Sequence, residues 1–239
     1  MIKRLLTGLA LLLASFFVFS PVQAREKPTI AVAEFKNTSG ASWWRGGMGW
    51  EISGMVTNEL ANTGHFRVVE RKKLHHVLRE QDLGASGRIR RSTAAKMGQL
   101  TGAKYLVMGT VTSYEESTEG SDAGFSFKGI SIGGKKKNAY IAVDLRVVDS
   151  TTGEIVAART IEAKASSGGL RLGLNKWGFG GQLGKFSRTP AGKAVRACVM
   201  HIVDYLDCAL VKKGNCMAEF DAAEQRRRSK TKSSISLDE

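Results

Sequence analysis

Two glycine-rich segments, residues 120–134 and 168–184, restrict most strongly what this chain can fold into. The first contains the stretch FSFKGISI, in which two phenylalanines occupy odd positions and two isoleucines occupy even positions. A single strand would place these pairs on opposite faces, because side chains alternate along a strand. A two-residue turn at Lys128-Gly129 would bring all four to one face, and glycine tolerates the backbone angles of such a turn. The predicted apolar face consists of Phe125, Phe127, Ile130 and Ile132.

The second segment, LRLGLNKWGFGG, obeys the same rule. A turn at Asn175-Lys176 would pair Leu174 with Trp177 across the hairpin. The large apolar side chains then share one face, and glycine and arginine occupy the other. The predicted apolar face consists of Leu170, Leu172, Leu174, Trp177 and Phe179.

A hairpin with one apolar face can lie on the core of its own domain, extend a sheet into a partner, or cross a membrane within a closed barrel. A membrane-crossing strand needs about 9–11 residues with alternating lipid-facing and lumen-facing side chains. Two hairpins supply too few strands to close a barrel, and unpaired strand edges are not tolerated in hydrocarbon. The hypothesis that both apolar faces meet lipid therefore requires a homo-oligomeric ring, in which neighbouring copies complete a transmembrane β-barrel.

The amino-terminal residues predict export. Lys3 and Arg4 precede an apolar run over residues 5–20, and Ala24 ends a short segment of the kind that is cleaved after a secretory signal peptide. The alternative is an uncleaved anchor, but about 16 apolar residues fall short of the ~20 that a spanning helix needs. No cysteine lies near the predicted cleavage site, so no amino-terminal lipid is expected. Export also argues against nucleic acid as the partner of this basic chain, whose formal net charge is +14.

The remaining sequence predicts an α/β (α+β) periplasmic domain with helices packed on a mixed sheet. Along the chain, strands are expected at 29–35, 65–70 and 104–114, and helices from Trp50 to Asn62, from Arg71 to Gln81, and from Ser92 to Gly102. Residues 140–165 alternate as two strands joined by a turn at 151–153. In the first of these, Ile141, Val143 and Leu145 share one face, with Asp144 and Arg146 opposite.

The predicted organisation has seven parts, each with its own composition. These are a signal peptide at 1–24, the first part of the periplasmic domain at 25–118, hairpin 1 at 119–138, sheet strands at 139–165, hairpin 2 at 166–189, a carboxy-terminal helix at 190–214 and a basic tail at 215–239. The tail has almost no large apolar residues after Arg226, so we expect it to be disordered.

Three cysteines remain to be placed. Cys208 and Cys216 could close a short disulfide loop in an oxidising compartment, whereas Cys198 lies in an apolar helical pattern and is expected to be a buried, inert thiol. No residue set predicts catalysis or a metal site: Cys198 and His201 lie three residues apart on the expected helix, but two ligands do not make a zinc site. We therefore expect no enzyme activity and no cofactor.

Several blocks of the sequence resemble the curli secretion channel family, CsgG. They are FRVVERKKLHHVLREQDL from Phe66, AAKMGQLTGAKYLVMGTVTSYE from Ala94, and NAYIAVDLRVVDSTTGEIVAARTI from Asn138, and the resemblance extends from Lys27 to about Leu210. It implies a ring of about nine periplasmic domains, each of which contributes two hairpins to an outer-membrane barrel that exports unfolded polypeptide. Accessory periplasmic proteins are possible further partners.

The resemblance also suggests a role for three tryptophans that fall within eight residues, in the loop stretch ASWWRGGMGW. In that family, the loop after the first strand lines a narrow constriction with aromatic side chains, and Trp43 and Trp44 lie at the matching place. The alternative is that both indoles pack against their own domain or a neighbour. The competing function is a non-inserting periplasmic protein that binds and activates a partner, similar to the lipoprotein activators of peptidoglycan synthases.

Overall fold

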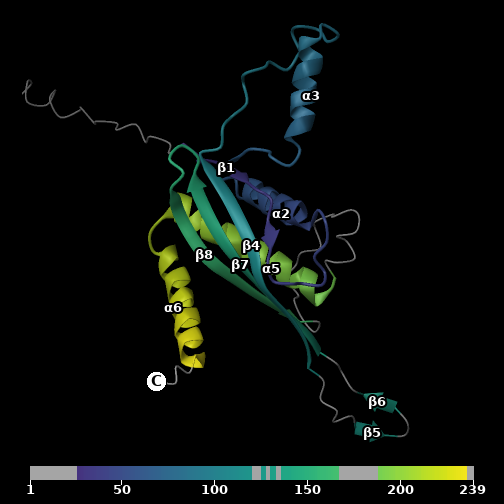
Figure 1. Ribbon diagram of the computed structural model, residues 1–239, viewed down its shortest axis with the longest axis vertical. Coiled ribbons are helices and arrows are strands. Elements are labelled where there is room, and N and C mark those ends of the chain that lie inside the picture. Colours follow the sequence, from purple (N-terminus) through teal and green to yellow (C-terminus); the bar gives the residue numbers. More distant parts are fainter. Residues whose placement is uncertain (1–25, 120–124, 128–129, 133–135, 167–187, 236–239) are drawn as a thin grey trace, which may run out of the picture.

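Three long antiparallel strands form the centre of the molecule in a computed structural model (Figure 1). They are β4 (Tyr105–Glu119), β7 (Lys136–Asp149) and β8 (Ile155–Ser166), in the order β4-β7-β8. The structure describes residues 26–119, 125–127, 130–132, 136–166 and 188–235. The predicted alternation in β7 is confirmed: Ile141, Val143 and Leu145 are buried, while Asp144 and Arg146 are exposed.

Three short strands complete the mixed sheet on the other side of β4. β1 (Thr29–Val32) pairs in parallel with both β4 and β3 (Arg67–Val68), which gives the order β3-β1-β4-β7-β8. β2 (Lys36–Asn37) continues along β4 in parallel, opposite Thr110 and Val111. The observed α+β fold with a mixed sheet therefore matches the predicted class.

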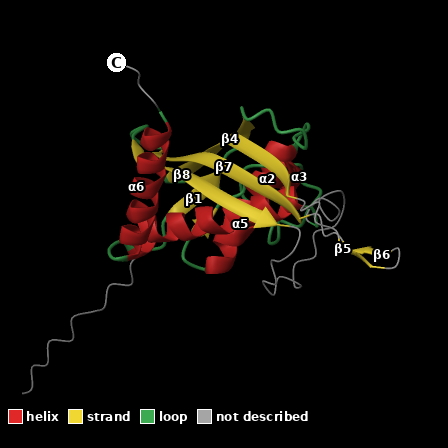
Figure 2. Ribbon diagram, turned by 90° about the horizontal axis from the view of Figure 1, so that it is seen from below, coloured by secondary structure: helices red, strands yellow, loops and turns green. Residues whose placement is uncertain are grey.

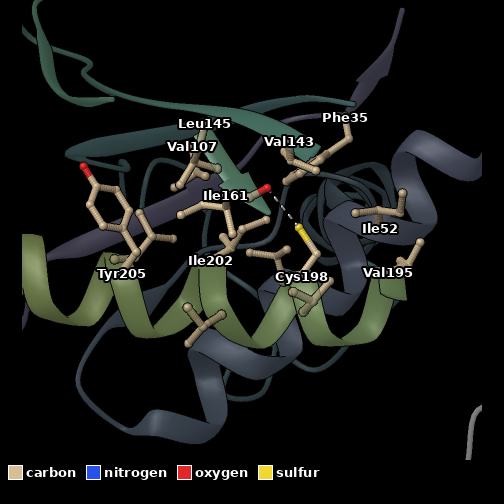
Figure 3. Packing of buried hydrophobic residues seen from close by; sticks show 14 of the residues in the cluster. Phe35, Ile52, Val107, Val143, Leu145, Ile161, Val195, Cys198, Ile202 and Tyr205 are labelled. Atoms are coloured by element: carbon tan, nitrogen blue, oxygen red, sulfur yellow. Dashed lines mark hydrogen bonds between the residues drawn. The ribbon is translucent and has the colours of Figure 1, made fainter. Parts of the chain in front are cut away.

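Two helices cover one face of the sheet (Figure 2). α2 (Met48–Thr63) and α5 (Pro190–Asp207) pack on each other and on the strands, and their apolar sides meet the buried face of β7 in one core (Figure 3). Cys198 lies in this core at 2% exposure, and its Sγ donates to the carbonyl oxygen of Ile161 at 3.8 Å. Burial raises the pKa of this thiol to about 12, in agreement with the predicted inert cysteine.

A separate small hairpin lies beyond the end of the sheet, between β4 and β7 in sequence (Figure 1). Its strands are β5 (Phe125–Phe127) and β6 (Ile130–Ile132). Phe125 is paired with Ile132 and Phe127 with Ile130, which is the register predicted from the sequence. The predicted second hairpin, residues 166–189, falls almost entirely outside the described residues.

The connection between β3 and β4, residues 71–102, differs from the prediction, and we call it the excursion. α3 (Leu74–Ala85) is present, but its apolar residues Val77 and Leu78 are 40% and 42% exposed and do not join the core. The helix expected from Ser92 to Gly102 is wrong: this stretch contains turns, and Met97 is 62% exposed. A helix of about ten residues is marginal without a surface to pack on, and this stretch has no core contact to stabilise it.

The carboxy-terminal tail is helical over most of its length, so the predicted disorder at 215–239 is wrong for residues 216–234. α5 passes into a short π-helix, η2 (Cys208–Lys212), and α6 (Cys216–Ser234) follows. The Cys208–Cys216 disulfide, predicted as a possibility, is present and ties the start of α6 to α5. No residue of α6 is buried, so the helix depends on such local ties rather than on a core.

Two contacts add to the disulfide. The Arg159 guanidinium donates to the carbonyl oxygen of Phe220 at 2.8 Å and to the Asp221 carboxylate at 2.6 Å. The Phe220 ring lies edge-on to Tyr205, with ring centroids 5.4 Å apart. α6 is therefore attached beside β8 (Figure 2). Of the helices in the described ranges, none is both long and apolar enough to cross a membrane.

Candidate functional site: the tryptophan loop at the base of the hairpin

The loop that carries Trp43 and Trp44 is fixed at both ends. At its start, the Thr38 amide donates to the carbonyl oxygen of Val111 in β4 at 2.9 Å, so the chain enters the loop while still paired to the sheet. At its end, the Phe35 amide donates to the carbonyl oxygen of Gly49 at 3.3 Å, in the first turn of α2. The two ends of the loop are thus held close together by backbone groups.

Hydrogen bonds within the loop fix its path. The Asn37 side-chain oxygen accepts from the Ser39 amide at 3.0 Å and from the Ser39 hydroxyl at 2.6 Å. The Trp44 amide donates to the carbonyl oxygen of Ala41 at 3.0 Å, closing a turn around the two indoles. The loop is therefore shaped by its own polar groups and does not need a partner to order it.

Both indoles are partly buried and pack against the edge of the core. Trp43 lies between two rings: Trp44 at 5.7 Å, and Tyr114 of β4 at 5.4 Å in an edge-on arrangement of 75°. Such tilted aromatic contacts are favourable beyond simple burial. The packing alternative for these residues is therefore observed, while each indole keeps part of its surface exposed.

A β-bulge directs Tyr114 toward this loop. Before the bulge, Val107 and Val111 pair with Val147 and Val143, all on the face covered by helices. The register then shifts between Val111 and Ser113, so that Tyr114 pairs with the buried Ile141 rather than alternating to the open face. Cross-strand partners share a face, so the extra residue places Tyr114 on the side where Trp43 lies.

The Tyr114 hydroxyl is kept neutral in this position. Burial, together with the nearby Glu116 carboxylate, raises the pKa of Tyr114 to about 12. The hydroxyl donates to the Glu116 carboxylate at 3.3 Å. The three aromatic rings, Trp43, Trp44 and Tyr114, form what we call the aromatic cluster.

The aromatic cluster lies where the sheet narrows toward the hairpins. Beyond Tyr114, β4 and β7 stay paired as far as Glu119 and Lys136, and Asn138 of β7 is paired with Ser166, the last residue of β8. Residues 115–118 of β4 are exposed. Both predicted hairpin segments, 119–138 and 166–189, are therefore inserted at the same end of the sheet, next to the aromatic cluster.

The predicted site residues are brought together only in part. Trp43 and Trp44 are adjacent in the structure, as expected, and the backbone register of the first hairpin brings its four apolar residues into cross-strand pairs. Leu170, Leu172, Leu174, Trp177 and Phe179 of the second hairpin lie outside the described residues. That any of these nine side chains meets lipid stays a prediction.

Sequence reasoning missed Tyr114 and Gly49. Strand alternation would have put Tyr114 on the open face, and only the bulge reverses this. Gly49 allows α2 to approach the connection between β1 and β2 closely, because a Cβ there would overlap the Phe35 carbonyl oxygen. A glycine in the first turn of an otherwise apolar helix was the one signal available for this contact.

Acidic, histidine and cysteine side chains do not gather into a metal-binding group anywhere in the described part of the chain. His75 and His76 stack at 4.0 Å on the exposed face of α3. Cys198 is buried, and His201 is exposed with its Nδ1 3.4 Å from the Glu162 carbonyl oxygen.

Comparison with known proteins gives one consistent family. The family model described as "Curli production assembly/transport component CsgG" matches residues 13–235. Proteins of that same description from Salmonella typhimurium and Escherichia coli K12 are each 28% identical over 108 residues, which is 44% of this chain and 39% of the relative. Each curated match therefore spans well under half of the relative's length.

Solved structures are more distant. A hypothetical protein from Chlamydia trachomatis is 15% identical, with a TM-score of 0.40 over 76% of this chain and 98% of that one. The PelC dodecamer of Paraburkholderia phytofirmans is 14% identical, with a TM-score of 0.37 over 75% of this chain and 88% of that chain.

Proposed function

Because the chain belongs to the CsgG family of curli production assembly/transport components, we propose that it is the subunit of an oligomeric outer-membrane secretion channel. In this proposal each copy contributes two hairpins to a shared barrel, and unfolded polypeptide passes through the ring. The family is described by assembly and transport rather than by a catalytic activity, and the proposed role needs neither an active site nor a cofactor.

The observation that carries the proposal is the common exit of both hairpin segments. The chain leaves the sheet after Glu119 and after Ser166, at the same end, and returns at Lys136 and ahead of Pro190. Two insertions at one end of a sheet can enter the same membrane while the helices and the sheet remain on one side of it. Oligomerisation follows from hydrogen bonding, since strand edges need partners in hydrocarbon.

The aromatic cluster supports a constriction on the periplasmic side of the proposed barrel. Its loop is held by backbone hydrogen bonds to β4 and by internal turns, so a ring of copies would present the indoles at one level. Trp43 and Trp44 keep part of their surface exposed, which leaves apolar area for a passing chain. Aromatic faces make non-specific contacts with apolar and peptide groups, so they suit an unfolded cargo.

The experiment that tests the channel is planar-bilayer recording of the purified protein, combined with gel electrophoresis of unheated samples. We expect discrete conductance steps and a heat-sensitive band far larger than one chain. Trp43→Ala with Trp44→Ala should enlarge the single-channel conductance, because two indoles are removed from each copy of the constriction. Trp50→Ala is the matched control: it removes an equally large side chain from α2, outside the aromatic cluster, and should leave the conductance unchanged.

Two results would contradict parts of this proposal, and a third would invalidate the conductance comparison. A water-soluble monomer without conductance would exclude the channel and favour the alternative, a periplasmic protein that binds and activates a partner. Channels whose conductance is the same with and without Trp43 and Trp44 would restrict these residues to packing. A conductance change in the Trp50→Ala control would show that the measurement reports general damage to the fold.

A further inference from the structure

Among the residues whose burial the structure describes, exposed large apolar side chains are concentrated at the end of the molecule opposite to the hairpins. Eight large apolar residues of the described chain are exposed, and all but Ile235 lie at this end. Five belong to the excursion between β3 and β4, residues 71–102, and two lie at the start of β8. They are Val77, Leu78, Leu83, Met97 and Leu100 in the excursion, and Ile155 and Val156 in β8.

Strand register places these two groups on opposite edges of the sheet at the same level. Val68 of β3 pairs with Ile30, which pairs with Tyr105, which in turn pairs with Asp149. One step further, Val148 pairs with Ile155 at the start of β8. Because β3 and β8 are the two ends of the strand order, the excursion leaves from one edge and Ile155 lies on the other.

The excursion has internal packing of its own. Gln81 of α3 is 7% exposed, and the backbone of Gly84 lies so close to Ala94 and Ala95 that a Cβ there would come within 3.0 Å of the Ala95 carbonyl oxygen. α3 therefore packs on the chain that follows it, and its apolar surface remains uncovered. Figure 1 shows α3 on the side of α2 and β1, away from β8.

The excursion and the segment that leads into β8 differ in charge. Residues 71–102 contain eight lysines and arginines but only two acidic residues. Residues 149–158, by contrast, contain Asp149 and Glu154 and no basic residue, and Glu154 is exposed. The basic excursion of one copy can therefore meet the Asp149 and Glu154 carboxylates near the start of β8 in the next copy, whereas two excursions would repel each other.

We propose that the excursion of one copy, residues 71–102, docks on the β8 edge of the next copy at Ile155 and Val156. The occupant is a second copy of this chain, because the two surfaces differ in sign and lie on opposite edges. Such head-to-tail contacts close into a ring when each copy is rotated by a constant angle. The inference rests on the proposed ring and names an interface that holds it together on the side away from the membrane.

The test is chemical cross-linking of a double variant, Leu78→Cys with Ile155→Cys, in the full chain. The native cysteines do not interfere, since Cys208 and Cys216 are disulfide-bonded and Cys198 is buried. A short bis-maleimide should then link successive copies into a ladder of multimers. A mixture of the two single variants should give dimers and no larger products, because each copy then carries only one reactive thiol.

A matched control pair is Leu78→Cys with Ser234→Cys, which moves the second thiol to the exposed end of α6. This pair should give no ladder. An assembled ring in which Leu78→Cys with Ile155→Cys remains unlinked would overturn the inference and leave the channel standing. Cross-linking confined within single chains would overturn it as well, because α3 would then fold onto its own β8. Protein that forms no ring would refute both.

Discussion

Gly49 offers the sharpest test of how the tryptophan loop is closed. In the first turn of α2 this glycine faces the connection between β1 and β2, and a Cβ would overlap the Phe35 carbonyl oxygen and lie 2.9 Å from Glu34 Cγ. The obstacle is backbone that is itself hydrogen-bonded, since the Phe35 amide donates to the carbonyl oxygen of Gly49 at 3.3 Å. Gly49→Ala must therefore either strain this contact or move the start of α2.

The expected magnitude follows from two opposing effects. Overpacking of a tight site costs about 3 kcal/mol at its upper range, which applies here because backbone rather than a flexible side chain obstructs the methyl group. Alanine is preferred over glycine inside a helix by about 1 kcal/mol. The net loss in free energy of unfolding for Gly49→Ala should therefore be about 2 kcal/mol.

The matched control lies one and a half turns along the same helix. Nothing lies within 4 Å of a Cβ built on Gly54, so Gly54→Ala should add about 0.5–1 kcal/mol through helix propensity alone. The two variants should thus differ by about 3 kcal/mol and in opposite directions from the wild-type protein. Urea unfolding followed by far-ultraviolet circular dichroism measures this, at one protein concentration because oligomerisation shifts apparent stability.

Two outcomes would refute the reasoning. Equal or greater stability of Gly49→Ala would mean that α2 and the chain at Phe35 can separate without cost, so the loop is not closed by this contact. A loss of stability in Gly54→Ala would mean that this face of α2 is covered in the assembled protein, and it would then identify a contact between copies.

Three further outcomes can be measured. Because burial raises the pKa of Cys198 to about 12, the thiolate fraction of this residue at pH 8 is on the order of 10⁻⁴. Ellman reagent should therefore label Cys198 only after denaturation. Prompt labelling of the folded protein would place the thiol at the surface. Cys216→Ser removes the disulfide at the start of α6. Trypsin should then cleave within residues 226–232 much faster than in the wild-type protein, while the sheet stays protected. Unchanged cleavage would show that the Arg159 hydrogen bonds are enough to hold α6. Leu172→Asp with Phe179→Asp should abolish recovery of the protein in the membrane fraction, because a charge that faces lipid costs a few kcal/mol per site near the midplane. Normal recovery would show that these two residues do not face lipid.

The parts of the fold that the sequence predicts well are those in which a single periodicity decides the outcome. In β7, apolar and polar residues alternate strictly from Val143 to Val147, which predicts the buried face, and the structure agrees over this stretch. In the first hairpin, the shift of apolar residues from odd to even positions requires a two-residue turn, and the register of β5 and β6 follows from it. Both inferences use only near neighbours in sequence.

Contacts between distant segments could not be predicted in this way. Trp43 and Tyr114 are far apart in the chain, and their meeting depends on a bulge that no composition or spacing signals. Likewise α6 reads as a disordered tail because it buries nothing, yet the Cys208–Cys216 disulfide and the Arg159 hydrogen bonds hold its first turns. The i to i+3 pair of Glu224 with Arg227 adds a local contribution.

β4 links the candidate constriction to the proposed membrane segment. The loop is anchored to this strand at Val111, its tryptophan packs on Tyr114 of the same strand, and the strand then continues to Glu119. Five residue steps separate Tyr114 from Glu119, or about 16 Å at ~3.3 Å per residue, so the aromatic cluster would lie just inside the periplasmic boundary of the barrel. Since β4 is paired with β7 throughout this interval, that distance cannot change without a slip in register. A slip of one residue would also turn Tyr114 away from Trp43, so the pairing that positions the candidate constriction also preserves the contact between these two rings.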